Sequence, residues 1–448
     1  MSLLSAVFLL GGVGSGAHAA ATRTARSVPA TRTLPAAAPT GPVSSTPASN
    51  TPELYKTGTT EQVRQLVACG GIMYAVGSFT EIKQGRLHYI RDNAFSFSAT
   101  SPYTVTSWDP DVNGIVNSIA FDGSDCSNAY LGGQFSSIGG TSVKDIAEVS
   151  TSTGAVNPAF GHSTNGQVNT LVVAGGHLLT GGSFTSVNGS SQNYYVSLDP
   201  VTGRDDGYLQ LALTGSYQYP GAFTNHTNIY NQQLSHNGRR LLVEGVFTMV
   251  GGQPRQQIFM LDLGSASATL SDWTSAEFNQ FCADKHPFYV KAAAWAPGDS
   301  AVYTATTGEF AFGWNQTYPL TGLCDSVAAF PSAEQSVSHE WINYDGCDSL
   351  YSVAADASTV YAGGHQRWAD NANGCNDAGP GSVAAPGMGG FSPATGALTF
   401  NLTRSRGLGA DDMLLTTKGL WIASDNFEAS DKCAGVADHA GICFLPYS

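Results

Sequence analysis

The stretch Ala129-Tyr130-Leu131-Gly132-Gly133-Gln134-Phe135 is one of seven related segments in this chain. Each segment follows an apolar strand-like run and a short turn, and each ends in Gly-Gly or a variant of it. A repeat of roughly 50 to 63 residues made of short strands is typical of propeller blades. The spacing therefore predicts an all-β protein, a seven-bladed β-propeller. The copies begin near Val63, Val116, Val168, Tyr230, Tyr289, Tyr351 and Asp412.

Each repeat continues beyond its glycines with two more strand-like segments. The third ends in a turn, as at 195–200, and the fourth is more polar, as at 105–110. This order predicts blades of four antiparallel strands, with the first strand nearest the central channel. The last repeat stops at its third strand, 441–446. We expect Glu53-Leu54-Tyr55-Lys56-Thr57 to supply the fourth strand, because such closure leaves no open sheet edge.

The chain divides into three parts by composition. A short apolar run at 3–13 is followed by Ala17-His18-Ala19-Ala20, so we interpret 1–20 as a signal peptide, although no Lys or Arg precedes the run. Residues 21–51 are rich in Ala, Thr, Pro and Ser and are predicted to be a disordered linker. Residues 52–448 carry the repeats and form one domain.

Charge and cysteine content indicate where the protein works. The net charge of −14 argues against nucleic acid or an anionic membrane as the partner. We expect a secreted, extracellular protein without membrane insertion, and a monomer. Eight cysteines without a Cys-x-x-Cys pair fit disulfides in an oxidising compartment. Proximity in the repeat map suggests four pairs, with other connectivities open: Cys69–Cys126, Cys282–Cys324, Cys347–Cys375 and Cys433–Cys443.

The long insertions share one face of the predicted propeller. In a four-stranded meander, the connections after the second and fourth strands lie on the same side. Binding residues concentrate on long loops carried by a rigid scaffold, so this insertion face is the expected functional face. The insertions are 214–227, 276–287, 310–324, 365–386 and 425–440.

The densest polar cluster opens the insertion of the sixth repeat. It contains His365, Arg367, Trp368 and Asp370. A planar ring can stack on a sugar, while a guanidinium hydrogen-bonds hydroxyls or a carboxylate. The alternative is structural, with Trp368 holding the loop on the blade and Arg367 paired to Asp370.

A group of acidic residues is expected on the same face, in the seventh repeat. Asp411 and Asp412 begin its innermost strand, and Asp425 and Asn426 end the neighbouring strand. Their oxygens could bind Ca²⁺, the one cofactor that the sequence suggests, or supply the acid and base of a glycosidase. The alternative is a strand-entry cap with loop hydrogen bonds.

A third candidate group precedes the innermost strand of the fifth repeat. Lys285, His286 and Tyr289 lie there. A Tyr or His base beside a cation could remove the proton α to a uronate carboxylate, as lyase chemistry requires. The alternative is a solvated surface pair.

The repeats resemble a known group of proteins. The Tyr-x-Gly-Gly-x-Phe strand, followed by 197–203 and 391–396, resembles the delta-sixty-type repeats of secreted actinobacterial β-propellers. The resemblance covers most of 52–448 and implies a secreted propeller. It implies no activity for any residue.

The sequence therefore predicts a secreted propeller that binds an extracellular carbohydrate or cell-surface glycan on the insertion face. One alternative is a polysaccharide lyase or glycoside hydrolase that uses carboxylates and His or Tyr on that face. Another is an extracellular protein-interaction scaffold, since propellers present broad rigid surfaces.

Overall fold

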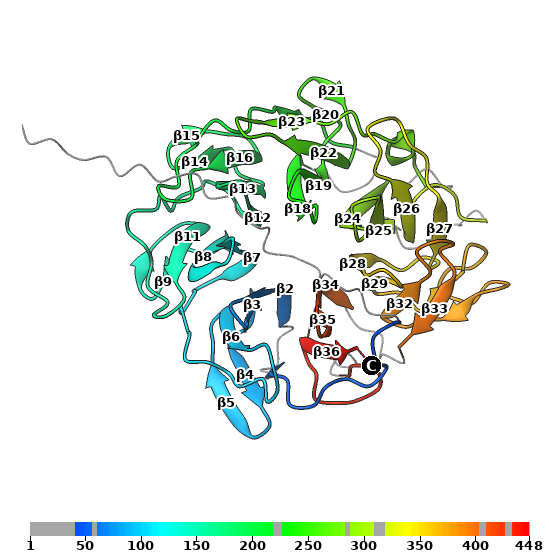
Figure 1. The fold of residues 1–448 in the computed structure, drawn as a ribbon, viewed down its shortest axis with the longest axis horizontal. Helices are drawn as coiled ribbons and strands as arrows, with labels where there is room; N and C mark the ends of the chain where they lie inside the picture. The colour runs from blue at the N-terminus through cyan, green and yellow to red at the C-terminus, as the bar shows by residue number, and fades with distance from the viewer. Residues whose placement is uncertain are drawn as a thin grey trace, which may run out of the picture.

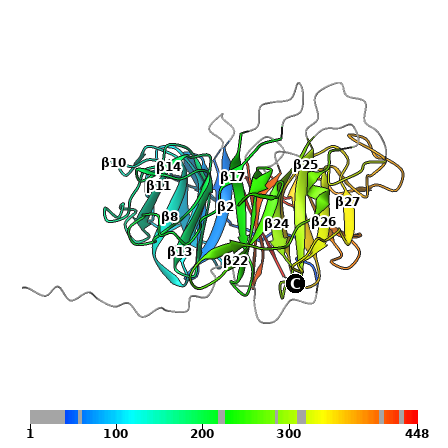
Figure 2. The ribbon, with the colours of Figure 1, turned by 90° about the horizontal axis from the view of Figure 1, so that it is seen from above.

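The computed structural model describes residues 41–55, 61–217, 226–282, 287–308, 319–402, 409–425 and 432–447. Their strands include seven antiparallel meander sheets, which stand side by side in a ring (Figure 1). From the side, the ring is a squat disc (Figure 2). This all-β arrangement is that of a β-propeller, and it agrees with the prediction from the repeats.

In every sheet the first strand lies innermost, and the chain then steps outward strand by strand. The first three sheets have three strands each. They are β2 (Gln62–Cys69), β3 (Ile72–Ser78) and β6 (Ala94–Ser98); β7 (Ile115–Asp122), β8 (Asp125–Gln134) and β11 (Ile146–Ser150); and β12 (Val168–Ala174), β13 (His177–Gly182) and β16 (Tyr195–Leu198).

The next three sheets have the full four strands, and the last has three. They are β18 (Asn228–Leu234), β19 (Arg240–Val246), β22 (Ile258–Leu263) and β23 (Ala268–Leu270); β24 (Phe288–Trp295), β25 (Ala301–Gly308), β26 (Ser326–Pro331) and β27 (Trp341–Tyr344); β28 (Leu350–Ala355), β29 (Val360–Gly364), β32 (Met388–Phe391) and β33 (Leu398–Asn401); and β34 (Ala410–Thr416), β35 (Gly419–Ser424) and β36 (Ile442–Pro446).

The fourth strand is thus only partly formed. In the first sheet it is reduced to one bridge, between Phe97 and Val105, and single bridges at Val156 and Asp205 replace it in the next two sheets. The prediction of four strands therefore holds for the fourth, fifth and sixth sheets among the described residues.

The connection between the second and third strands often folds into a small hairpin. In the second sheet this hairpin turns at Gly139 and Gly140, both with positive φ. The sequence analysis did not predict these hairpins. They are β4 (Glu81–Gln84) with β5 (Leu87–Ile90), β9 (Ser137–Ile138) with β10 (Thr141–Ser142), β14 (Ser186–Val187) with β15 (Ser190–Ser191), β20 (Met249–Val250) with β21 (Gln253–Pro254), and β30 (Trp368–Ala369) with β31 (Val383–Ala384). Two short strands extend them, β1 (Glu53–Leu54) on β4 and β17 (Leu213–Thr214) on β20, and a 3₁₀ turn covers Ala276–Asn279.

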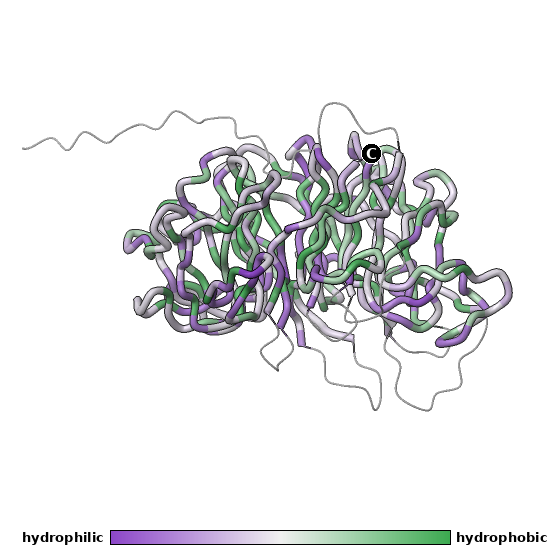
Figure 3. Tube along the Cα trace, turned by 90° about the horizontal axis from the view of Figure 1, so that it is seen from below, coloured by the Kyte–Doolittle hydropathy of each residue, from purple (hydrophilic) through white to green (hydrophobic). Residues whose placement is uncertain are grey.

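Hydrophobic side chains fill the space between neighbouring sheets. Apolar segments run through the sheets, and polar segments gather at their edges (Figure 3). Each interface has its own cluster, and the last joins Trp421 and Phe444 to Phe97 of the first sheet. Trp273 is completely buried between the fourth and fifth sheets, and its indole N–H donates to Pro331 O at 2.9 Å. Burial of apolar area between sheets therefore holds the ring together.

Steric crowding explains why the second residue of the Gly-Gly motif is glycine. A Cβ on Gly133 would lie 2.0 Å from the carbonyl oxygen of Ile115, on the innermost strand. The same close approach occurs at Gly77, Gly182, Gly245 and Gly364. Only glycine, which has no Cβ, fits at this distance from a carbonyl oxygen. The glycine of each repeat therefore marks the position where the second strand passes closest to the backbone of the first.

The N-terminal segment lies beside the last strand, in a different register from the one expected. Ser44 N donates to Pro446 O at 2.7 Å and Ala48 N to Phe444 O at 2.8 Å. Val43 is buried and bridges Tyr447. Glu53 and Leu54, which were expected to pair with the last sheet, form their ladder with β4, while Leu54 N also donates to Ala440 O, just before β36, at 2.8 Å. The contacts with β36 thus come from residues that composition assigns to the linker.

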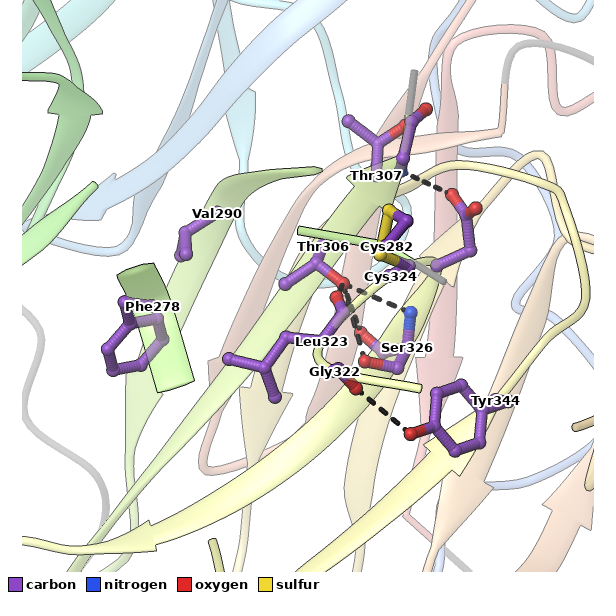
Figure 4. Close-up of a disulfide and its surroundings, with 12 residues drawn as sticks. Phe278, Cys282, Val290, Thr306, Thr307, Gly322, Leu323, Cys324, Ser326 and Tyr344 are labelled. Atoms are coloured by element: carbon purple, nitrogen blue, oxygen red, sulfur yellow. Dashed lines mark hydrogen bonds between the residues drawn. A yellow bond between two sulfur atoms is a disulfide. The ribbon is translucent and has the colours of Figure 1, made fainter. Parts of the chain in front are cut away.

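All eight cysteines form disulfides, in the four pairs that the repeat map suggested: Cys69–Cys126, Cys282–Cys324, Cys347–Cys375 and Cys433–Cys443. Cys282–Cys324 joins two insertions beside β25, where Thr306 accepts from Ser326 N and Tyr344 donates to Gly322 O (Figure 4). Such pairing indicates an oxidising environment. Across the ranges the structure describes, no helix has the length and apolar character needed to span a membrane.

The pairing of the N-terminal segment can be tested by truncation. A chain that starts at Gly41 should have the same free energy of unfolding as the full chain. A chain that starts at Thr51 should have a free energy of unfolding lower by about 3 kcal/mol. The truncation exposes the apolar surface that Val43 covers and removes hydrogen bonds to β36. Guanidinium unfolding followed by circular dichroism measures both. Equal midpoints for the two truncations would refute the pairing.

The packing between sheets predicts a cost at Trp273. Trp273→Ala should lower the free energy of unfolding by about 3–5 kcal/mol, because it leaves a large cavity in a buried interface. Trp368→Ala is the matched control, since Trp368 is only partly buried on the hairpin β30–β31. An equally large loss in the control would show that the unfolding measurement does not report on the interfaces between sheets.

Candidate functional site

Every innermost strand contains a β-bulge near its start. In each pairing of first and second strands, one residue near the start of the first strand is passed over in the register, for example Lys291 between Val290 and Ala292. A bulge re-aims the extra side chain, and bulges are frequent beside functional sites. The seven passed-over residues are called here the channel ring. They are Arg64, Asn117, Asn169, Tyr230, Lys291, Tyr351 and Asp411.

All seven channel-ring residues line one cavity on the axis of the propeller. The cavity has a volume of about 610 Å³. It lies at the end of the innermost strands where each second strand ends and the insertions begin, so it opens toward the insertion face. The other lining residues are also polar: Gln62, Gln65, Ser118, Gln167, Thr170, Ser183, Asn228, Asn231 and Asp412.

One arc of the ring places a cation between two aromatic rings. The ammonium of Lys291 lies 4.7 Å from the centre of the Tyr230 ring and 6.0 Å from that of Tyr351. Ring faces carry negative potential, so both tyrosines attract the ammonium. Burial lowers the pKa of Lys291, while the charge of Asp411 acts in the opposite direction.

The next arc pairs an acid with a cation. Asp411 accepts a hydrogen bond from Gln62 Nε2 at 2.8 Å. Burial lowers the pKa of Arg64, and the charge of Asp411 opposes that effect. Asp412 lines the same cavity, and its Oδ2 accepts from Leu66 N at 3.0 Å. Asp412 thus ties the last sheet to the first.

The remaining arc consists of two amides that bind the neighbouring sheet. Asn117 Nδ2 donates to Val168 O at 2.9 Å, and Asn169 Nδ2 donates to Ile229 O at 2.7 Å. Both bonds cross to the innermost strand of the next sheet. These donors therefore fix the ring, and the amide oxygens remain as acceptors along the cavity.

The expected cluster in the sixth repeat separates into two parts. His365 approaches the channel ring, since its Nδ1 lies 3.3 Å from Tyr351 OH. Arg367 Nη1 donates to both carboxylate oxygens of Asp348 at 3.0 Å, and not to Asp370. Trp368 donates its indole N–H to Asn376 O. Arg367 and Trp368 therefore hold the insertion in place in this structure.

The other described members of the predicted groups have partners within the fold, and Asp425 bridges Gln62, which also donates to Asp411. Asp370 exchanges hydrogen bonds with Asn343. Asp425 is fully buried, and its carbonyl accepts from Gly441 N. Tyr289 packs against Tyr217, with ring centres 5.7 Å apart. Lys285, His286 and Asn426 lie outside the described residues.

The described residues, which include Asp411, Asp412 and Asp425, contain no group of three His, Cys, Asp or Glu side chains placed to hold a metal ion. A buried acidic group, formed by Asp325, Asp345 and Asp348, does occur beside Arg367. Burial and the charges of Asp325 and Asp348 raise the pKa of Asp345. Arg367 neutralises Asp348, which is consistent with a structural role for that pair.

Most of the channel ring lies outside the site residues expected from the sequence, which share only Asp411 with it. The pattern was nevertheless present. In each repeat a buried apolar residue, such as Val63, Val116 or Val168, is followed at once by a polar or aromatic one. Comparing that single position across the repeats would have identified the ring residues.

No family model matches the chain, so the resemblance to delta-sixty-type repeats stays a prediction. No curated protein matches it either. Among solved structures, the WD40 β-propeller domain of Doa1 is similar, with a TM-score of 0.40, 11% identity, and coverage of 88% of this chain and 95% of that one. The computationally designed Ika8 protein gives a TM-score of 0.45, 9% identity, and coverage of 88% and 98%. At these scores neither likeness carries an argument about function.

A buried carboxyl lies directly behind the cavity wall. Glu244 stands on β19 as the register partner of Asn231, which lines the cavity. Its side chain is completely buried, and within the described residues neither carboxyl oxygen has a hydrogen-bond partner. Burial raises the pKa of Glu244 to about 8. Glu244 is therefore protonated at neutral pH in the folded protein.

This pKa predicts a pH dependence of stability. The unfolded chain releases the Glu244 proton near its ordinary pKa of 4.5, whereas the folded chain keeps it until about 8. Stability should therefore fall as pH rises between these values. Glu244→Gln removes the titration, so the variant should match the wild type at pH 5. At pH 9 it should exceed the wild type by on the order of 4 kcal/mol.

The measurement is denaturant unfolding of both proteins at several pH values. The difference between them isolates Glu244, because all other carboxyls are common to both. A constant difference from pH 5 to 9 would show that Glu244 does not titrate in this range.

Proposed function

We propose that this protein is an extracellular, seven-bladed propeller that binds a carbohydrate in the cavity bounded by the channel ring. One observation carries the proposal: every residue that lines the cavity is polar, and two of them are tyrosines. Sugar hydroxyls both donate and accept hydrogen bonds. Amide, hydroxyl and charged side chains satisfy them, while aromatic rings contact the apolar faces of the sugar.

The size and position of the cavity support this assignment. Its volume of about 610 Å³ lies in the range usual for small-ligand sites, about 300–1,000 Å³. Most of the lining side chains stand on strands of a rigid ring, so little ordering free energy is lost on binding. An apolar ligand would leave these polar groups unsatisfied, at a cost of about 1–3 kcal/mol each.

The insertion face contributes the rim of this site. His365 contacts Tyr351 of the channel ring. Arg367 and Trp368 position the insertion that begins there, so their substitution would act on the ligand through the loop. Glycan contact by Arg367, Trp368 or Asp370 themselves is a further part of the proposal. The four disulfides support an extracellular setting.

The proposal can be tested by blocking the cavity. Ser183 is an exposed lining residue, so Ser183→Trp should fill part of the cavity without disturbing the core. Binding to ligands found in a glycan array should fall by about tenfold or more, equal to about 1.4 kcal/mol. Ser190→Trp, on the exposed hairpin β14–β15, is the matched control and should bind normally.

The outcomes distinguish the alternatives. Unchanged binding by Ser183→Trp would place the site elsewhere, and the insertion around Arg367 and Trp368 would be next. New reducing ends or unsaturated uronates in the reaction mixture would identify a hydrolase or a lyase. A glycan array without any bound sugar would refute carbohydrate binding.

A further inference from the structure

The cavity brings two cations and two carboxylates, Asp411 and Asp412, to the axis of the propeller. The chain contains 20 Lys and Arg against 34 Asp and Glu. Two of these cations, Arg64 and Lys291, nevertheless occupy channel-ring positions and line the same cavity. Each lies on a bulge, so both side chains are directed to the axis by the backbone itself.

Lys291 lies between two aromatic rings, and the charge of Asp411 also acts on it. Its neighbours in the ring are Tyr230 and Tyr351, with ring centres at 4.7 and 6.0 Å. Cation–π attraction contributes about 0.5–2 kcal/mol and leaves the donor hydrogens of the ammonium available.

Arg64 also has hydrogen-bond donors that the protein does not use. Its guanidinium has five N–H donors, and its buried Nε has no hydrogen-bond partner in the described part of the chain. The acid beside it, Asp411, accepts from Gln62. One carboxylate therefore stands near two cations, and the charge of Asp411 influences both.

We propose that the saccharide carries an anionic substituent, a carboxylate or a sulfate, and that Lys291 and Arg64 bind it together. This inference rests on the carbohydrate proposal above and narrows it to acidic sugars. An anion between the two cations would receive charge-assisted hydrogen bonds from donors that the protein leaves unused. These bonds are about twice as strong as neutral ones, and the partly desolvated cavity strengthens them further.

The arrangement also explains the two tyrosines. They occupy the two channel-ring positions that flank Lys291, so no carboxylate stands at either flanking position. A carboxylate at either flanking position would satisfy the ammonium internally and weaken the attraction for an external anion. Burial raises the pKa of Tyr351, which keeps its phenol neutral.

The experiment compares an acidic sugar with its neutral form. Binding of trigalacturonate and of its methyl ester is measured by calorimetry on the full chain, with 6-sulfated maltotriose and plain maltotriose as the sulfate arm. We expect the acidic member of one pair or of both to bind at least about tenfold more tightly than its neutral counterpart. The pair that shows the difference identifies the anion.

Variants then assign the effect to a residue. Lys291→Met should lose about tenfold or more in affinity for the acidic sugar and little for the neutral one. Lys291→Arg keeps the charge and should retain most of the affinity. Lys418→Met is the matched control, because it removes one positive charge at an exposed turn away from the cavity.

Three negative results have different meanings. Equal binding of acid and ester, and of sulfated and plain maltotriose, would overturn the anion proposal and leave carbohydrate binding standing. Unchanged binding of the acidic sugar to Lys291→Met would remove Lys291 from the site. Failure of every sugar in the array and in these titrations would refute the proposed function itself. The comparison of acid and ester uses the wild-type chain, so it does not depend on the folding of a variant.

Discussion

A close contact between two backbones determines much of this structure. In five sheets the second strand passes so near a carbonyl of the innermost strand that only glycine fits, as at Gly133 against Ile115 O. The register partner of that glycine is Val116, the residue just before the bulge. Close approach, glycine and bulge thus form one local unit, and the unit re-aims the next side chain toward the axis. In the fifth and seventh sheets Thr306 and Ser424 stand at the glycine position and the bulge is kept, so the polar cavity depends on the bulge itself.

In the repeated backbone unit, some positions maintain the fold and another position can carry different side chains. The glycine and the apolar residue before the bulge maintain the contact between strands, whereas the bulged residue is free to vary. In the second and third sheets the bulged asparagines bind the next sheet through their amide donors. In the fourth to sixth sheets the bulged residues are Tyr230, Lys291 and Tyr351. The same position is therefore structural on one side of the ring, and on the other side it is the position that we propose for ligand contact.

The sequence predicted the repeat architecture and the disulfides well, because both follow from spacing. Gly-Gly motifs recur at regular intervals, and cysteines at equivalent places in adjacent repeats come together. The N-terminal segment was harder to predict. Val43 lies among Thr, Pro and Ala residues without periodicity, and its partner Tyr447 is at the other end of the chain. Only tertiary contact gives that segment its place.

The site was harder to predict than the fold, for a related reason. A bulge is a change of register between two strands, and a single strand read as a sequence does not reveal it. The polar cluster at Arg367 and Trp368 stood out because its residues are adjacent in sequence. In the structure, however, Arg367 contacts Asp348 and Trp368 contacts Asn376. The channel-ring residues are separated by whole repeats, and the fold brings them together.

The contrast between these two sets follows from what each part of the fold must satisfy. A long insertion needs internal hydrogen bonds to remain ordered, and its polar side chains supply them, as Arg367 does with Asp348. The innermost strands have their backbone groups paired within the sheets. Their bulged side chains can therefore remain unused by the fold, as the ammonium of Lys291 does. In a propeller of this kind, the side chains available for a ligand are those of bulged residues, because the residues before and after them on the innermost strand already form the hydrogen bonds of the sheet.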